Sequence, residues 1–181
     1  GSSADGSHLL LRANAKLPPF VASGGATQLY ECVDSSELRL VSLLPGEVTS
    51  AAGAAAGTAL SGVGGGGFRL GSITNAISED GSRIFWTTAA NGPAPLYVRI
   101  DGTETVEIAA SSARFRAASP DGSRVVYSVG KDLFEAAVEP EASSSTKIAG
   151  ELDGVLRPQR DRKSTRLNSS HYALTRMPSS A

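Results

Sequence analysis

Residue types that usually carry chemistry are scarce in this 181-residue chain, which has one cysteine, two histidines and one methionine. A single cysteine, Cys32, excludes an internal disulfide and any zinc site built from several cysteines. The charge is nearly balanced, with 17 Lys and Arg against 18 Asp and Glu, so the chain lacks the basic surface that attracts nucleic acid. No apolar run has the length of a membrane span. We therefore expect neither a nucleic-acid partner nor a membrane-spanning segment.

Internal repetition is the strongest positive feature of the sequence. Three segments share the pattern S-x-D-G-S, then His or Arg, then three apolar residues: SADGSHLLLRA at 3–13, SEDGSRIFWTT at 78–88 and SPDGSRVVYSV at 119–129. An Asp-Gly pair between β-rich segments predicts a tight turn, because glycine adopts positive φ readily and the carboxylate accepts from nearby backbone N–H groups. The predicted structural turns are Asp5-Gly6, Asp80-Gly81 and Asp121-Gly122.

Each copy of the pattern is accompanied by further short strand-like segments. They lie at 28–34, 95–101 and 132–138, at 38–43, 105–110 and 146–150, and before the next Asp-Gly at 73–78 and 113–119. Four strands per unit, with 41 residues between Asp80 and Asp121, match the period of about 40–45 residues of propeller blades. The three successive apolar residues after each turn indicate a strand buried on both faces.

The S-x-D-G-S-[HR] pattern and the later Leu-Tyr with a trailing Asp resemble the repeat of TolB-like, WD-repeat-like β-propellers, over residues 1 to about 150. The resemblance implies an all-β fold, a partial propeller of about three four-stranded antiparallel blades forming an open arc. It also implies a bacterial, exported protein, whether periplasmic, cell-surface or secreted. Two departures stand out. The first copy lies 75 residues before the second, and the third has Leu-Phe without a trailing Asp.

These patterns predict the domain organisation. Residues 1–44 form a first blade that is truncated at its N-terminus, 71–112 a second, and 113–160 a third with the start of the next. Residues 45–70 are rich in glycine and alanine, which favours a long mobile insertion loop. A glycine-rich phosphate cradle is the alternative for this loop, but the G-x-x-x-x-G-K-[ST] pattern is absent.

The last 21 residues, DRKSTRLNSSHYALTRMPSSA at 161–181, differ from the rest of the chain. They lack the repeat pattern and hold four basic side chains and one acidic one, so that the chain without them is mildly acidic. They resemble the translation of a common sequencing-library adapter. We expect a non-native, disordered tail, and a genuine basic tail is the alternative. The adapter hypothesis removes His171 from any catalytic role.

No catalytic, cofactor-binding or metal site is predicted. His8 occupies the position of Arg83 and Arg124 in the other copies, so we expect a surface residue at the start of a strand. The G-x-S-x-G pattern of a serine nucleophile is absent. The repeated aspartates belong to different blades, which favours three equivalent turns over one shared calcium site.

The predicted function is a non-catalytic β-propeller module that binds a protein or a small ligand and is a fragment of a larger exported protein. The alternative is the gating propeller of a prolyl-oligopeptidase-like serine peptidase whose hydrolase domain is missing. Three blades cannot close into a ring, so the faces of the end blades stay uncovered. We expect Leu9–Leu11, or Leu133 and Phe134, to be more exposed than Ile84–Trp86, and the fragment to self-associate through this apolar surface.

Overall fold

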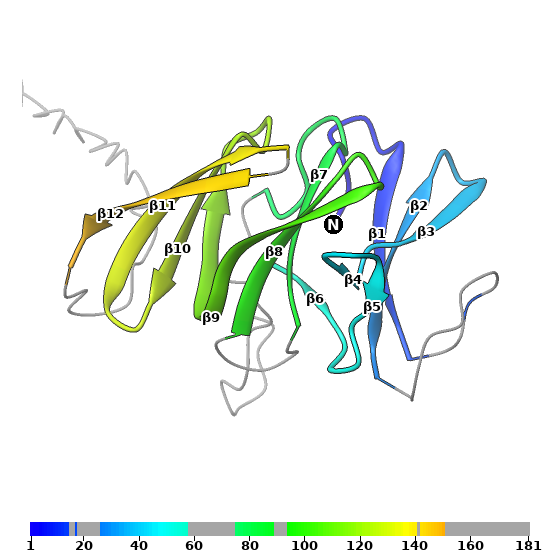
Figure 1. Ribbon diagram of the computed structural model, residues 1–181. Coiled ribbons are helices and arrows are strands. Elements are labelled where there is room, and N and C mark those ends of the chain that lie inside the picture. Colours follow the sequence, from blue (N-terminus) through cyan, green and yellow to red (C-terminus); the bar gives the residue numbers. More distant parts are fainter. Residues whose placement is uncertain (15–16, 18–25, 58–74, 89–93, 141, 151–181) are drawn as a thin grey trace, which may run out of the picture.

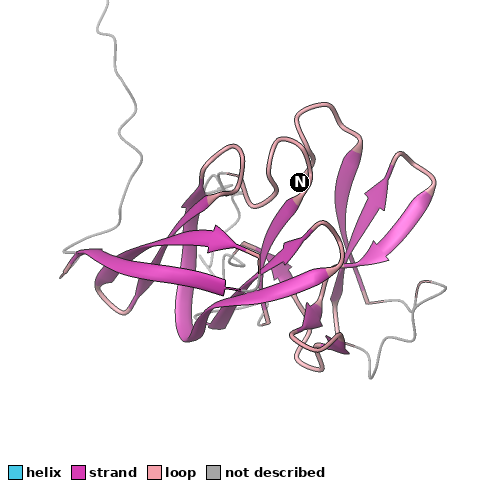
Figure 2. Cartoon of the chain, turned by 45° about the horizontal axis from the view of Figure 1, so that its top comes forward, coloured by secondary structure: helices cyan, strands magenta, loops and turns pink. Residues whose placement is uncertain are grey.

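A computed structural model describes residues 1–14, 17, 26–57, 75–88, 94–140 and 142–150. Every regular element within these ranges is a β-strand, and all strand pairs are antiparallel (Figure 2). The prediction of an all-β fold is therefore confirmed. No helix long and apolar enough to cross a membrane occurs in the described ranges.

The strands form three open sheets that follow one another along the molecule (Figure 1). The first sheet contains β1 (His8–Ala13), β2 (Gln28–Val33) and β3 (Glu37–Leu40), and a small hairpin of β4 (Leu43–Leu44) and β5 (Val48–Thr49) comes next. The third sheet has seven strands in the order β12-β11-β10-β9-β8-β7-β6. Its strands are β6 (Ala55–Ala56), β7 (Arg83–Thr87), β8 (Ala94–Ile100), β9 (Glu104–Ala118), β10 (Arg124–Val129), β11 (Asp132–Glu139) and β12 (Ala142–Ala149).

The three sequence repeats pair their strands in the same register. The residue directly after S-x-D-G-S lies opposite the same position of the following strand in every copy: His8 opposite Val33, Arg83 opposite Ile100, and Arg124 opposite Ala137. The strand that precedes each turn is also present, though it is only a single bridge in the first two repeats, Ser2 with Leu9 and Ile77 with Ile84.

The second and third repeats share one continuous sheet, where separate four-stranded blades were expected. Strand β9 pairs with β8 through Glu104–Ala109 and Ala113, and with β10 through Ala113–Ala118. Between these two pairings lies Ser112 with a φ of 56°, a left-handed conformation that bends the strand. Only residues 110–112 separate the main β8 pairing from the β10 pairing. The chain therefore passes from the second repeat into the third within one strand, without a loop.

Part of the expected insertion loop at 45–70 is ordered into strands. Residues 45–57 contain β5 and β6, and β6 pairs with Trp86 and Thr87 of β7. Ala54 and Ala55 are buried, so small side chains serve here as close-packing residues. Gly53 has a φ of 79°, and a Cβ there would lie 2.8 Å from the carbonyl oxygen of Thr27. Residues 58–70 lie outside the described residues, as do residues 151–160 and the tail at 161–181.

The apolar core consists of two clusters, each lying between neighbouring repeats. The cluster between the first and second repeats includes Leu29, Val41, Ile84, Trp86 and Tyr97, with the Trp86 and Tyr97 rings stacked at a centroid distance of 4.9 Å. The cluster between the second and third includes Phe85, Leu96, Val98, Phe115, Val125 and Tyr127. Successive residues of β7 thus pack on opposite neighbours, as expected for a strand buried on both faces.

The end strand β1 differs from this pattern. Leu9 and Leu11 are 39% and 44% exposed, whereas Ile84 and Trp86 at the equivalent positions of β7 are 1% and 0% exposed. The expected difference in exposure between the end and middle repeats is confirmed. The prediction that Leu9–Leu11 is buried on both faces is wrong, because the side chains of Leu9 and Leu11 are in contact with solvent.

This contrast gives a matched pair of substitutions for measurement by urea unfolding. We expect Ile84→Ala to lower the free energy of unfolding by about 2–5 kcal/mol, because it opens a cavity between two packed sheets. The equivalent Leu9→Ala should cost less than about 1 kcal/mol, because Leu9 is already in contact with solvent. Equal losses in the two variants would contradict the packing of the repeats described above.

Candidate functional site

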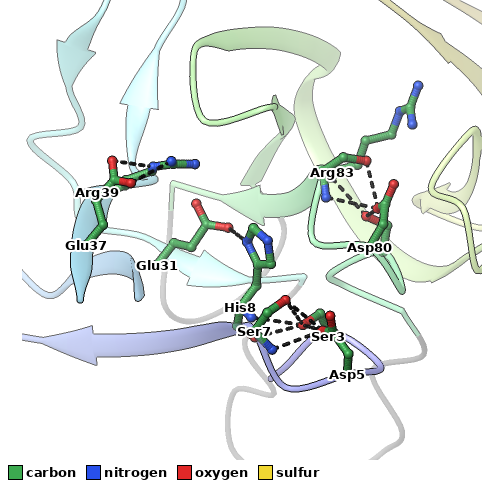
Figure 3. Close-up of polar contacts among 11 residues, drawn as sticks. Ser3, Asp5, Ser7, His8, Glu31, Glu37, Arg39, Asp80 and Arg83 are labelled. Carbon is green, nitrogen blue, oxygen red and sulfur yellow. Dashed lines mark hydrogen bonds and ion pairs between the residues drawn. The ribbon is translucent and has the colours of Figure 1, made fainter. Parts of the chain in front are cut away.

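The polar residues that recur in all three repeats gather in the S-x-D-G-S turns. In the second repeat, Oδ1 of Asp80 accepts from the Ser78 hydroxyl at 2.6 Å, and from the backbone N–H and hydroxyl of Ser82 at 3.0 and 2.8 Å. The Ser78 hydroxyl oxygen accepts in turn from the Arg83 N–H at 2.9 Å (Figure 3). Gly81 closes the turn with a φ of 77°. One carboxylate oxygen thus holds both sides of the turn.

The same four hydrogen bonds occur in the other two repeats, with lengths between 2.6 and 3.1 Å. There Asp5 and Asp121 accept from the flanking serines, and Gly6 and Gly122 have φ values of 76° and 68°. The structure therefore places all six predicted turn residues in equivalent positions. It does not bring the three carboxylates into one shared site, because no group of three or more possible metal ligands occurs among the described residues.

Backbone hydrogen bonds join each turn to the turn of the next repeat. The N–H of Ala4 donates to the carbonyl of Glu79 at 2.8 Å, and the N–H of Glu79 donates to the carbonyl of Pro120 at 2.8 Å. All three residues stand at the variable position of S-x-D-G-S. Proline has no N–H, so Pro120 can accept from this ladder but cannot extend it.

Side chains also lie across neighbouring turns. A Cβ at Gly81 would fall on the imidazole ring of His8, and one at Gly122 would lie 2.8 Å from Cβ of Arg83. Glycine at these two positions therefore provides both the positive φ and the space for the side chain of His8 or Arg83 from the preceding repeat. Gly6 differs, since nothing lies within 4 Å of the corresponding point.

His8 begins β1, as expected, but its side chain is only partly exposed, so the expectation of a surface residue holds in part. Its side chain is 19% exposed, and its Nδ1 lies 2.6 Å from Oε1 of Glu31, whose side chain is 2% exposed. The ring points toward Glu31 and away from Ser3 and Ser7 (Figure 3). The contact that the structure gives the ring is the one from Nδ1 to Glu31.

The third repeat contains the equivalent ion pair, between Arg124 and Glu135 at 2.7 Å. In the second repeat Val98 takes the place of the carboxylate and is fully buried. Arg83 there donates to the Asp121 carbonyl of the next turn at 3.2 Å. The sequence analysis did not identify Glu31 or Glu135. Both stand two positions after the leucine of their strands, so an alignment of the repeats would have matched them.

A second ionic contact fixes the β4–β5 hairpin on the large sheet. The two terminal nitrogens of the Arg99 guanidinium, Nη1 and Nη2, both donate to the Glu47 carboxylate. Nη1 also donates to the Thr105 hydroxyl at 3.0 Å, and Nη2 to the Gly102 carbonyl at 2.8 Å. The Arg99 side chain is 4% exposed. The hairpin belongs to the segment that was expected to be a mobile loop, and this contact ties it to β8.

Hydrogen bonding to the turn carboxylates changes their acidity. The hydroxyl of Ser7, together with its N–H and the Ser3 hydroxyl, lowers the pKa of Asp5 to about 2. The Ser119 hydroxyl, followed by the N–H of Ser123, lowers the pKa of Asp121 to about 2. The pKa of Asp80 is lowered as well, chiefly by the Ser78 hydroxyl. Donors that point at a carboxylate favour its ionised form.

The comparisons with known proteins add no relative to this description. No family model, curated protein or solved structure matches the chain. The relation to TolB-like propellers therefore stays a resemblance that the repeats carry.

The turn geometry predicts the effect of removing one carboxylate. We expect Asp80→Ala to lower the free energy of unfolding by about 1 kcal/mol, as for other lost side-chain caps, because two serine hydroxyls and one N–H lose their acceptor. Glu79→Ala is the matched control, since the bonds at residue 79 between turns use its backbone alone. An equal loss in the control would show that the carboxylate has no special role.

The lowered pKa values predict how stability depends on pH. A carboxyl group whose pKa is lower in the folded state stabilises the fold above its unfolded pKa and loses this contribution as pH falls. Unfolding measured by urea at successive pH values should therefore show stability falling from about pH 3.8 toward pH 2. Asp121→Asn keeps one acceptor oxygen but removes the charge, so it should flatten this dependence. An unchanged profile would contradict the bonding of Asp121.

Proposed function

We propose that this chain is part of a non-catalytic β-propeller module of a longer, exported protein, and that the loops of the module bind a protein or a small ligand. The observation that supports the proposal is the stacking of three equivalent turns, joined by backbone bonds through Ala4, Glu79 and Pro120. Each repeat places its strands against those of the next, which is the arrangement that propeller blades use. The assignment to binding rests on analogy at the level of the fold.

The polar side chains support binding over catalysis. The turn carboxylates accept from serines of their own turns, His8 is paired with Glu31, and Arg99 is bonded to Glu47. These groups act within the fold and are already satisfied. Loops between strands are where propellers present variable residues to a ligand, so we assign recognition to them.

The test is the complete reading frame, together with a probe for serine nucleophiles. We expect further S-x-D-G-S copies about 40–45 residues apart, and no labelling of the full-length protein by a fluorophosphonate. A downstream G-x-S-x-G followed by Asp and His, with labelling that is lost when its serine becomes alanine, would overturn the proposal. That outcome would instead identify the gating propeller of a serine peptidase.

A further inference from the structure

Asp-Gly pairs have a chemical reactivity of their own, in addition to forming turns. The side-chain carboxyl group of the aspartate can react with the backbone nitrogen of the next residue, and glycine leaves that nitrogen accessible because it has no Cβ. Four such pairs lie in the described part of the chain: Asp5-Gly6, Asp80-Gly81, Asp101-Gly102 and Asp121-Gly122. The two groups must be free to approach each other, so the fold decides which pairs react.

Hydrogen bonds occupy both reacting groups in the three S-x-D-G-S turns. In the second repeat, Oδ1 of Asp80 accepts from the serines on both sides, which fixes the carboxylate. The Gly81 N–H donates to the Ser78 carbonyl at 3.0 Å. The N–H groups of Gly6 and Gly122 donate in the same way, at 3.3 and 2.9 Å. Neither group can move toward the other until these bonds open.

Ionisation protects the same turns further. The reaction releases a carboxyl oxygen as water, which requires the neutral acid, because a carboxylate is a poor electrophile. The serine donors lower the pKa of Asp5 and of Asp121 to about 2, and they also lower the pKa of Asp80. Donors of this kind favour the ionised form, so little of the reactive acid is present in these turns near neutral pH.

Asp101-Gly102 lies in a different turn, between β8 and β9 of the middle repeat (Figure 1). Both residues have positive φ, 50° and 67°, and the Thr103 N–H closes the turn by donating to the Ile100 carbonyl at 3.0 Å. Asp101 is exposed. Among the described residues, no hydrogen bond or ion pair holds its carboxylate, and the Gly102 N–H has no acceptor. Both reacting groups are therefore free.

We propose that Asp101-Gly102 is a site of spontaneous isoaspartate formation, and that the fold protects the other three pairs. The Gly102 nitrogen attacks Cγ of Asp101, a C–N bond forms, and the carboxyl hydroxyl leaves with the amide proton as water. Water then opens the succinimide ring. Cleavage of the new C–N bond restores aspartate. Cleavage of the bond from the nitrogen to the main-chain carbonyl carbon leaves the backbone running through Cβ and Cγ, which is isoaspartate.

The modification would affect contacts beyond the turn. The N–H of Asp101 donates to the Ser82 carbonyl at 2.7 Å, and the Gly102 carbonyl accepts from Arg99 at 2.8 Å. Isoaspartate adds an atom to the main chain between these two groups, so they can no longer keep both bonds in their present geometry. The same guanidinium holds Glu47. Modified chains should therefore have a lower urea midpoint than unmodified ones.

The first repeat contains a matched turn with a different second residue. Asp34 and Ser35 have positive φ, 48° and 56°. The N–H of Asp34 donates to the Ser7 carbonyl at 2.7 Å, as the N–H of Asp101 does to the serine of its own repeat. The Ser35 side chain hinders approach to the nitrogen. This turn should therefore react more slowly than the turn at Asp101, although the two have the same backbone shape.

Peptide mapping of the full chain tests the proposal, because trypsin places each pair in a different peptide. Asp101-Gly102 falls in 100–114, and the three protected pairs fall in 1–12, 70–83 and 117–124. The folded chain is stored near neutral pH at body temperature, and isoaspartate is measured by electron-transfer fragmentation. It should form at least about tenfold faster in 100–114, because the other turns must first break several hydrogen bonds. In urea, where no turn persists, the four rates should agree within about threefold.

Two reciprocal variants separate the effect of the residue from that of the turn. Ser35→Gly should raise isoaspartate formation at Asp34 to a rate close to that at Asp101, since glycine keeps the positive φ without strain. Gly102→Ser should slow formation at Asp101 toward the rate at Asp34. The matched turn shows that serine adopts this φ, and the added Cβ would lie 3.2 Å from Cδ of Arg39, a flexible side chain.

Three results would overturn the proposal. One is a folded chain in which 100–114 reacts no faster than the peptides of the S-x-D-G-S turns. Another is a folded chain in which 100–114 stays unmodified while the unfolded chain reacts. The third is Ser35→Gly without any increase at Asp34, because the glycine nitrogen would then not be responsible. The last result decides the question even if Gly102→Ser fails to fold.

Discussion

The arrangement of the whole molecule depends on the carboxylate at the centre of each S-x-D-G-S turn. Asp80 binds both flanking serines through one oxygen, and Asp5 and Asp121 do the same in their turns. This fixes the shape of the turn independently of the rest of the repeat. Because the three turns have one shape, their variable residues can form backbone bonds with one another. The register of the sheets and the positions of His8 over Gly81 and of Arg83 over Gly122 are consistent with this stacking.

The turns position the apolar strands, and the strands provide most of the stabilisation. A strand with three successive apolar residues needs a partner on each face. The fixed turn ladder presents alternate residues of β7 to different neighbours, so Phe85 and Trp86 enter separate clusters although they are adjacent in sequence. Burial of a large side chain contributes about 1.5–3 kcal/mol, more than any single exposed turn bond. The turns thus select the arrangement that the clusters stabilise.

Much of this could be predicted from the sequence, because the informative features are local. An Asp-Gly turn and a run of apolar residues can be recognised within a dozen residues, and the strands at 28–34, 95–101 and 132–138 follow the repeat. The role of Ala54 and Ala55 could not be predicted, because a strand of small residues has the composition of a flexible loop until its partner is known. The merging of two repeats through β9 likewise depends on the bend at Ser112, which no local pattern indicates.

The residue directly after each S-x-D-G-S turn has a different kind of partner in each repeat. Between the first and second repeats a buried carboxylate, Glu31, is compensated by His8, an arrangement in which loss of either partner leaves an unfavourable buried group. Between the second and third repeats Val98 replaces the carboxylate, and Arg83 bonds a carbonyl of the next turn instead. That choice leaves Nε of Arg83 buried without a partner among the described residues. The apolar interface thus gains packing and leaves one donor without a partner, whereas burial of Glu31 has a desolvation cost that its short contact with His8 offsets. At the third repeat the side chains of Arg124 and Glu135 remain partly exposed, so the pair there keeps part of its hydration and neither cost is incurred.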